Sequence, residues 1–191
     1  GGELQADAKG DVKVVAAENT THDTTRTHTR GFDGYAKETE GVSRQYRAGL
    51  SYEDQQQTRT TDTTEQQASS LKGGSVVVKA GGDVSIQGSD LKATAGDATV
   101  SGKNVELLAA HDKRTEAVDE TTTGGSFYYT GGIDRAGSGA QFSHQSSQDT
   151  AEKTTAQTST VAAAGKLTIN AGNTFTSEGA QAKAGAELQV N

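Results

Sequence analysis

The sequence predicts an all-β chain: a parallel β-solenoid with about three short strands per coil, interrupted by two long polar excursions. The first observation is a repeat, because residues 83–110 divide into four lines of seven, DVSIQGS, DLKATAG, DATVSGK and NVELLAA. The second is that this ladder and a long polar segment follow one another twice along the chain. The third is that only 31% of the 191 residues are hydrophobic, which is little for a compact globule but enough for a slender, extended core.

Each line of seven predicts one short strand and one corner. Apolar residues occupy the second and fourth positions, and alternation at period two is typical of a strand with one face inward. Frequent glycine and apolar residues only two apart argue against a helix or a coiled coil. Three such lines make a coil of about twenty residues, and strands in successive coils would then pair about 4.8 Å apart.

The predicted inward positions follow this alternation along the whole ladder. They are Leu4, Ala6, Val12, Val14, Val76, Val78, Val84, Ile86, Leu91, Ala93, Ala98, Val100, Val105, Leu107, Leu167, Ile169, Phe175, Ser177, Ala182, Ala184, Leu188 and Val190. The predicted corners are Asp83, Asp90, Asp97 and Asn104, whose side chains can bond the backbone of the following turn.

Internal similarity gives the domain organisation. DVKVVAAEN at residues 11–19 returns as NVELLAAHD at 104–112, and the segment 74–93 returns at 165–184, so one unit of about 92 residues occurs roughly twice. We expect a single solenoid array over 1–191, cut from a longer protein because the chain has no Met and opens on Gly-Gly. The expected ladder segments are 1–19, 72–112 and 162–191, and the expected excursions are 20–71 and 113–161.

The two excursions are rich in Thr, Gln, Ser and acidic residues, but each has a more apolar middle, YRAGLSYED at 46–54 in the first and GGSFYYTGG at 124–132 with GAQFSHQ at 139–145 in the second. Alternation returns in these middles, which favours β-hairpins; a flexible Thr- and Gln-rich loop is the alternative. Because the ladder resumes in register after each excursion, its two ends should lie close together.

Large apolar side chains outside the ladder gather in these middles. They are the candidate contact residues for a partner or a membrane: Tyr46, Leu50, Tyr52, Phe127, Tyr128, Tyr129 and Phe142. The alternative is that they pack the excursions onto the flank of the solenoid.

The sequence offers no catalytic, cofactor-binding or metal-binding set. There is no Cys and no GxSxG motif, and Ser143 and His144 are adjacent strand residues that point to opposite faces. His22 and His28 lack a third converging ligand. The corner aspartates fall on successive corners of one coil, which does not suit a calcium ladder. With a net charge of −7 and no basic cluster, a nucleic-acid partner is excluded, and we expect no enzymatic activity.

Several motifs together resemble a known family. They are the GxLxIxAGx pattern at 165–173, the AAEN and AAHD exits from the ladder, and SSLKGGSVVVKAGGDVSIQGSDL after the first excursion. They resemble the hemagglutinin repeats of filamentous-hemagglutinin-like exoproteins, bacterial proteins exported by two-partner secretion. The likeness is greatest to the second repeat region of CdiA-type contact-dependent growth-inhibition proteins.

This resemblance implies a right-handed parallel β-helix in a secreted virulence protein of the bacterial cell surface. It also implies adhesion or contact-dependent delivery of a toxin to neighbouring cells. Its partners would be an outer-membrane transporter, reached through parts of the protein outside this chain, and the surface or outer membrane of a target cell. The alternatives are a β-helix polysaccharide lyase and a passive adhesin stalk. Unpaired backbone at terminal coils makes end-to-end self-association plausible.

Overall fold

A computed structural model describes residues 2–39, 45–132 and 135–191, and in these ranges the chain forms strands and turns without any helix. The prediction of an all-β chain is therefore confirmed. The chain divides into two compact units. The stacked unit comprises Gly1–Thr21, Thr63–Arg114 and Lys153–Asn191, and the hairpin unit comprises His22–Asp62 and Thr115–Glu152.

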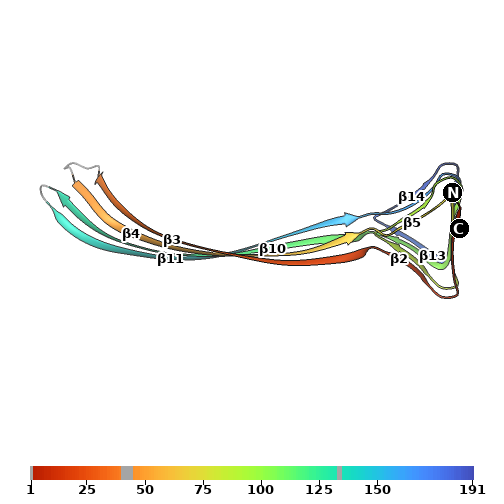
Figure 1. The fold of residues 1–191 in the computed structure, drawn as a ribbon, viewed down its shortest axis with the longest axis horizontal. Coiled ribbons are helices and arrows are strands. Elements are labelled where there is room, and N and C mark those ends of the chain that lie inside the picture. Colours follow the sequence, from red (N-terminus) through yellow and green to blue (C-terminus); the bar gives the residue numbers. More distant parts are fainter. Residues whose placement is uncertain (1, 40–44, 133–134) are drawn as a thin grey trace. The chain divides into compact units, whose positions relative to one another are not determined.

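Short strands of the stacked unit pair in parallel and form three columns. Several of these strands can be followed in Figure 1. The first column is β1 (Glu3–Ala8), β6 (Ser75–Ala80), then the first halves of β9 (Ala98–Leu108) and β13 (Leu167–Glu178), and β15 (Leu188–Val190). The second is β2 (Val12–Val15), β7 (Val84–Gln87) and the second halves of β9 and β13. The third is β5 (Ser70–Gly73), β8 (Asp90–Ala93), β12 (Ser159–Ala163) and β14 (Ala180–Ala184).

The register of these columns follows the repeat in the sequence. Val84 pairs with Val105, 21 residues later, whereas Val12 pairs with Val84 across the first excursion. The first two columns form one seven-stranded sheet and the third forms a separate four-stranded sheet, so the sheets are open. The right-handed coil with three strands stays a prediction.

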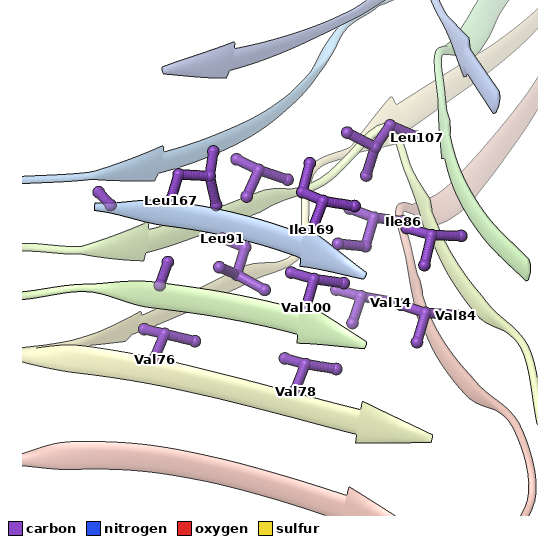
Figure 2. Close-up of a cluster of buried hydrophobic side chains, with 14 of the residues drawn as sticks. Val14, Val76, Val78, Val84, Ile86, Leu91, Val100, Leu107, Leu167 and Ile169 are labelled. Carbon is purple, nitrogen blue, oxygen red and sulfur yellow. The ribbon is translucent and has the colours of Figure 1, made fainter. Parts of the chain in front are cut away.

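The core lies where the columns face one another, and Figure 2 shows side chains from successive strands pointing into the same interior. Most predicted inward positions are buried or partly buried here, so the period-two prediction is confirmed for them. Four predicted inward residues are instead exposed: Phe175, Ser177, Leu188 and Val190. They lie on β15 and on the second half of β13, where no further strand covers them in the sheet order.

The polar corner residues bond to the neighbouring rung. Asp83 Oδ1 accepts hydrogen bonds from the backbone N–H of Asn104 at 3.2 Å and from its side-chain amide at 2.8 Å. Asp11 Oδ1 accepts from the Asp83 N–H at 2.9 Å, and Asp97 Oδ1 accepts from the Lys166 N–H at 2.7 Å. Where a bond to the turn that follows in sequence was expected, the bonds of Asp83 and Asp97 instead reach the backbone of the next rung.

At a second corner, after the strands of the second column, the chain either turns into the third column or leaves the stack. Backbone hydrogen bonds stack Ala16, Gly88, Ala109 and Gly179 at this corner, through N–H donors to Gln87, Leu108 and Glu178. Gly88 and Gly179 have φ of 56° and 60° and turn directly into the third column. After Ala16 and Ala109 the chain enters long strands instead. Because L residues with a Cβ avoid positive φ, glycine marks the rungs that close and alanine the rungs that open.

A serine closes this corner in three successive rungs. Ser89 Oγ donates to the Gln87 carbonyl at 2.9 Å. Ser69 Oγ donates to the Val15 carbonyl at 2.7 Å and Ser159 Oγ to the Leu108 carbonyl at 2.5 Å, although an excursion separates each of these pairs. The two ends of each excursion therefore lie together, as the resumed register indicates, and the rung closes in the same way with or without an insertion.

The excursions form four long strands: β3 (Ala17–Thr39), β4 (Gln45–Gln67), β10 (Ala110–Gly132) and β11 (Ala136–Gln157). They make one sheet in the order β11-β10-β4-β3. Strand structure was expected for the apolar middles alone, but it includes the Thr- and Gln-rich flanks as well. Thr has a branched Cβ that suits extended backbone, and pairing supplies the hydrogen bonds that a free loop would give to water.

Candidate contact surface of the hairpin sheet

Side-chain bonds between β3 and β4 and between β4 and β10 show how these long strands are aligned. His22 contacts Asp62 and, further along β3, Arg30 contacts Asp54, so partners on β4 descend in number as β3 advances. Gln55 and Arg59 of β4 contact Glu120 and Glu116 of β10 in the same descending order. The strands are therefore antiparallel, as the arrows in Figure 1 show for the strands of this sheet.

One face of this sheet carries large apolar side chains from all four strands. We call it the apolar face, and its exposed members are Phe32, Tyr46, Leu50, Phe127, Tyr129 and Phe142, with exposures between 57% and 83%. Tyr52 shares this face, because its ring lies 4.8 Å from that of Phe32. Phe127 and Phe142 meet edge to face with centroids 5.8 Å apart. Such ring pairs stabilise the arrangement without removing it from water.

The apolar face contains a cleft of about 300 Å³. It is lined by Phe32, Leu50, Ser51, Tyr52, Thr123, Gly124, Gly125, Phe127 and Phe142. Gly125 forms part of its floor, since a Cβ added there would lie 3.2 Å from the Phe142 ring. A second, shallower hollow shares Leu50 and Phe127 with the first. The cleft offers hydrocarbon contacts and few polar atoms, which suits an aliphatic guest more than a polar one.

The opposite face is polar and holds Tyr128. The ring of Tyr128 lies 3.4 Å from the Arg47 guanidinium carbon, a cation–π contact, and the Nε of Arg47 is buried without a hydrogen-bond partner. Asp33, Ser51, Glu53 and Gln55 line a separate cleft together with Thr29, Gly31 and Phe32. Of the seven candidate contact residues, the structure thus places six on the apolar face and Tyr128 behind it.

Phe32 is the residue that sequence reasoning missed. It is the most exposed large apolar side chain of this face, at 83%. In the sequence it stands alone in RGFDG, outside the apolar middle of the first excursion. It meets Tyr52 because β3 and β4 pair in antiparallel register. Aligning RGFDG with LSYED as the two strands of a hairpin would have predicted this contact.

A charged network borders the apolar face at Tyr52. Asp54, with a side chain only 14% exposed, accepts hydrogen bonds from the Tyr52 hydroxyl, Arg30 Nε and His28 Nε2, each at 2.9 Å. The bonds from Tyr52, Arg30 and His28 stabilise the carboxylate and lower the pKa of Asp54 to about 2. The same carboxylate raises the pKa of Tyr52, because it accepts the phenolic proton in a hydrogen bond. This network fixes the Tyr52 ring beside the cleft.

The histidines and corner aspartates do not gather as a metal site. His22 bonds to Asp62, His28 to Asp54, and His144 to the Thr123 hydroxyl at 3.0 Å. Over residues 2–39, 45–132 and 135–191 no group of three His, Cys, Asp or Glu side chains could hold a metal ion. No helix in that part of the chain is long and apolar enough to cross a bilayer.

Comparison with known proteins places this geometry in a family. The model of the hemagglutinin repeat family matches twice, over residues 1–122 and 50–191. The chain belongs to the hemagglutinin repeat family. The second match begins inside the first excursion, so the family model covers the hairpins as well as the ladder.

Two curated relatives share the sequence over most of its length. A hemolysin of Serratia marcescens is 44% identical over 192 residues, covering the whole chain and 12% of the relative. A hemolysin of Proteus mirabilis is 36% identical over 171 residues, covering 90% of the chain and 11% of the relative. The chain thus spans about a tenth of the length of these relatives.

A solved structure of the pneumolysin membrane pore complex also matches, covering 74% of this chain and 32% of that one. Its sequence identity is 6% and its TM-score 0.20, which is too low to indicate a shared fold.

Proposed function

We propose that this chain is an exported, non-catalytic segment of a long bacterial surface protein, in which the stacked unit is the scaffold and the apolar face of the hairpin unit contacts a target cell. The observation that carries the proposal is the concentration of exposed apolar side chains on one face of an ordered sheet. Large exposed apolar patches on folded proteins are typically binding surfaces. A scaffold alone would not need them.

Family membership supports the proposed export and location. Membership among hemagglutinin repeats supports two-partner secretion through an outer-membrane transporter, with the segment displayed outside the producing cell. Parallel rungs that close at serine corners also suit export as an extended chain, since each rung adds to the one before it. The right-handed parallel β-helix of the family is part of this proposal.

The activity of the whole protein has two candidate forms. The names of both relatives favour lysis of red blood cells. The resemblance to CdiA-type proteins favours contact-dependent delivery of a toxin to neighbouring bacteria. Either activity requires a contact step, and the proposal assigns that step, and no catalysis, to this segment.

Each excursion can be deleted so that the two ends join in the geometry of a closed corner, which tests the role of the hairpins. Deleting residues 110–158 together with Ala109→Gly joins Leu108-Gly-Ser159, which reproduces the closed corner Gln87-Gly88-Ser89. Deleting 17–68 with Ala16→Gly makes the equivalent joint Val15-Gly-Ser69. Both changes remove long strands while keeping each rung's closing serine.

The full-length protein and its transporter would be produced with each excision, and export and binding to target cells measured separately. We expect export to continue and target binding to be lost. Export with undiminished binding would show that the contact lies elsewhere. If an excision stops export, the double variant Phe127→Ser/Phe142→Ser, which keeps the chain length, decides the contact role.

Release of haemoglobin and killing of neighbouring bacteria, measured in parallel, distinguish the two whole-protein activities. A polyuronate-cleavage assay on this chain tests the absence of catalysis, and cleavage would replace the proposal with the lyase alternative.

A further inference from the structure

The two faces of the hairpin sheet differ in charge. On the apolar face, the side chains at positions 32, 34 and 36 of β3, 48, 50 and 52 of β4, 123, 125 and 127 of β10 and 140 and 142 of β11 are uncharged. Glu38 and Asp54 lie at the two ends of this span, whereas the opposite face carries Asp33 within it and Arg47 and Glu53 at its ends. Burying these charges in hydrocarbon would be costly, so only one face of this sheet suits an apolar phase.

We propose that the apolar face docks flat on a phospholipid bilayer with zwitterionic headgroups, inserting its aromatic side chains among the upper acyl chains while the opposite face stays in water. This inference rests on the proposed contact function and names its partner chemistry. It differs from a spanning arrangement, in which both faces would leave bulk water.

The cleft gives the docked face a specific lipid contact. Its walls are Phe32 and Tyr52 on one side and Phe127 and Phe142 on the other, and Gly125 leaves the floor open. An aliphatic chain fills such a space with carbon contacts and needs no hydrogen bond from it. A polar headgroup or a sugar would leave its hydroxyls without partners there.

The rim of the face matches the interfacial region of a bilayer. The Tyr52 hydroxyl donates to Asp54, which also binds Arg30 and His28, so a charged row stands directly beside the apolar span. Tyr46 and Tyr129 add two exposed phenols to the same face. Tyrosine prefers positions where its ring is apolar and its hydroxyl is wet, as at the headgroup level.

The charge of the unit selects the headgroup. The segments 22–62 and 115–152 contain seven Lys and Arg against thirteen Asp and Glu, a formal net charge of −6. An anionic surface would repel this unit, whereas a zwitterionic surface carries no net charge. The affinity must therefore come from apolar burial and should persist at high salt.

The chain contains no Trp, so a single introduced Trp can report on each face. Phe142→Trp places the reporter on the apolar face, and Tyr35→Trp places it on the opposite face, where the Tyr35 ring lies over Gly49. With phosphatidylcholine vesicles we expect the emission of the Phe142→Trp variant to shift to shorter wavelength and to be quenched by brominated acyl chains. The emission of the Tyr35→Trp variant should not change.

Shifts in both variants would overturn flat docking in favour of insertion, and no shift in either would overturn lipid binding. A shift in the Phe142→Trp variant that depends on protein concentration without vesicles would show instead that a second copy covers the face. Stronger binding to phosphatidylglycerol than to phosphatidylcholine would contradict the charge argument.

A flotation assay provides the matched variants. Phe127→Ser/Phe142→Ser should lower the vesicle partition coefficient at least about tenfold, because two exposed rings no longer bury their apolar surface among acyl chains. Phe175→Ser is the control, since Phe175 is an exposed ring of the stacked unit. Equal losses in the two variants would refute the proposal. Loss of vesicle binding with hairpin-dependent binding to target cells intact would leave the proposed function standing and point to a protein receptor.

Discussion

The stacked unit and the hairpin unit are both made of β-strands, yet they stabilise them by different means. In most strands of the stacked unit alternate side chains enter a shared core, and fifteen buried apolar residues of the described chain form one cluster. In the hairpin unit the large apolar side chains remain exposed, and the strands are joined by backbone pairing, ring pairs and cross-strand polar bonds. The core stabilises the stacked unit, whereas the hairpin unit leaves its apolar surface available for contact.

The largest expected difference between the units is at a matched pair of leucines. Leu107 is fully buried in the stack and Leu50 is 68% exposed on the apolar face. Leu107→Ala should lower the free energy of unfolding by about 2–5 kcal/mol, because it leaves a cavity in a narrow core. Leu50→Ala should change it by less than about 0.5 kcal/mol. Urea unfolding of both variants measures this, and comparable losses would show that the apolar face is part of the core.

The next effect concerns the corner that closes a rung. Gly88 has φ of 56°, and an added Cβ would lie 2.5 Å from that of Ala110. Gly88→Ala should therefore cost about 2–3 kcal/mol through backbone strain and contact.

Gly137 of β11 is the control, since an added Cβ there meets nothing within 4 Å, and Gly137→Ala should leave the unfolding midpoint nearly unchanged. If Gly88→Ala were as stable as the parent, glycine would not be needed at the corners where a rung closes.

A smaller effect is expected where serine clamps an excursion. Ser159 is fully buried, donates to the Leu108 carbonyl and accepts from the Ser89 N–H. Ser159→Ala should cost about 1–2 kcal/mol, because buried backbone groups lose their partner. Ser69→Ala removes the equivalent clamp at a more exposed corner and should cost less. Thermal unfolding ranks the two variants, and the reverse order would indicate that burial does not set the strength of the clamp.

The smallest effect is a change in pH dependence within the hairpin unit. Hydrogen bonds from Tyr52, Arg30 and His28 lower the pKa of Asp54 from 3.8 to about 2. The unfolded chain then binds its proton first as the pH falls. The stabilisation by Asp54 is complete above about pH 4 and is lost between about pH 4 and pH 2.

Asp54→Asn should reduce the fall in stability across this range, as measured by urea unfolding at a series of pH values. Asp149→Asn, on β11, is the matched control. Identical pH profiles for Asp54→Asn and the parent would show that the network has no influence on folding.

The burial of residues that follow a local repeat could be predicted from the sequence. The contacts of residues that depend on pairing between distant segments could not. Period two alone identified Val84, Ile86 and Leu107 as core, because alternation is a property of neighbouring residues. The aromatic candidates were found by composition. Alternation along β10 puts Tyr128 on the opposite face from Phe127 and Tyr129, whereas Phe32 joins the apolar face only because β3 and β4 pair in one particular register.

The sequence by itself determined the strand period and the alternation of a short-strand ladder with long polar segments. Each of these follows from short-range sterics and alternation. Only the tertiary structure decided that Asp83 bonds to the next rung, that Ser69 and Ser159 clamp the excursions, and that four distant strands share one apolar face. The physical reason is that hydrogen-bond register between segments tens of residues apart is set by stacking and pairing, and no local pattern specifies it.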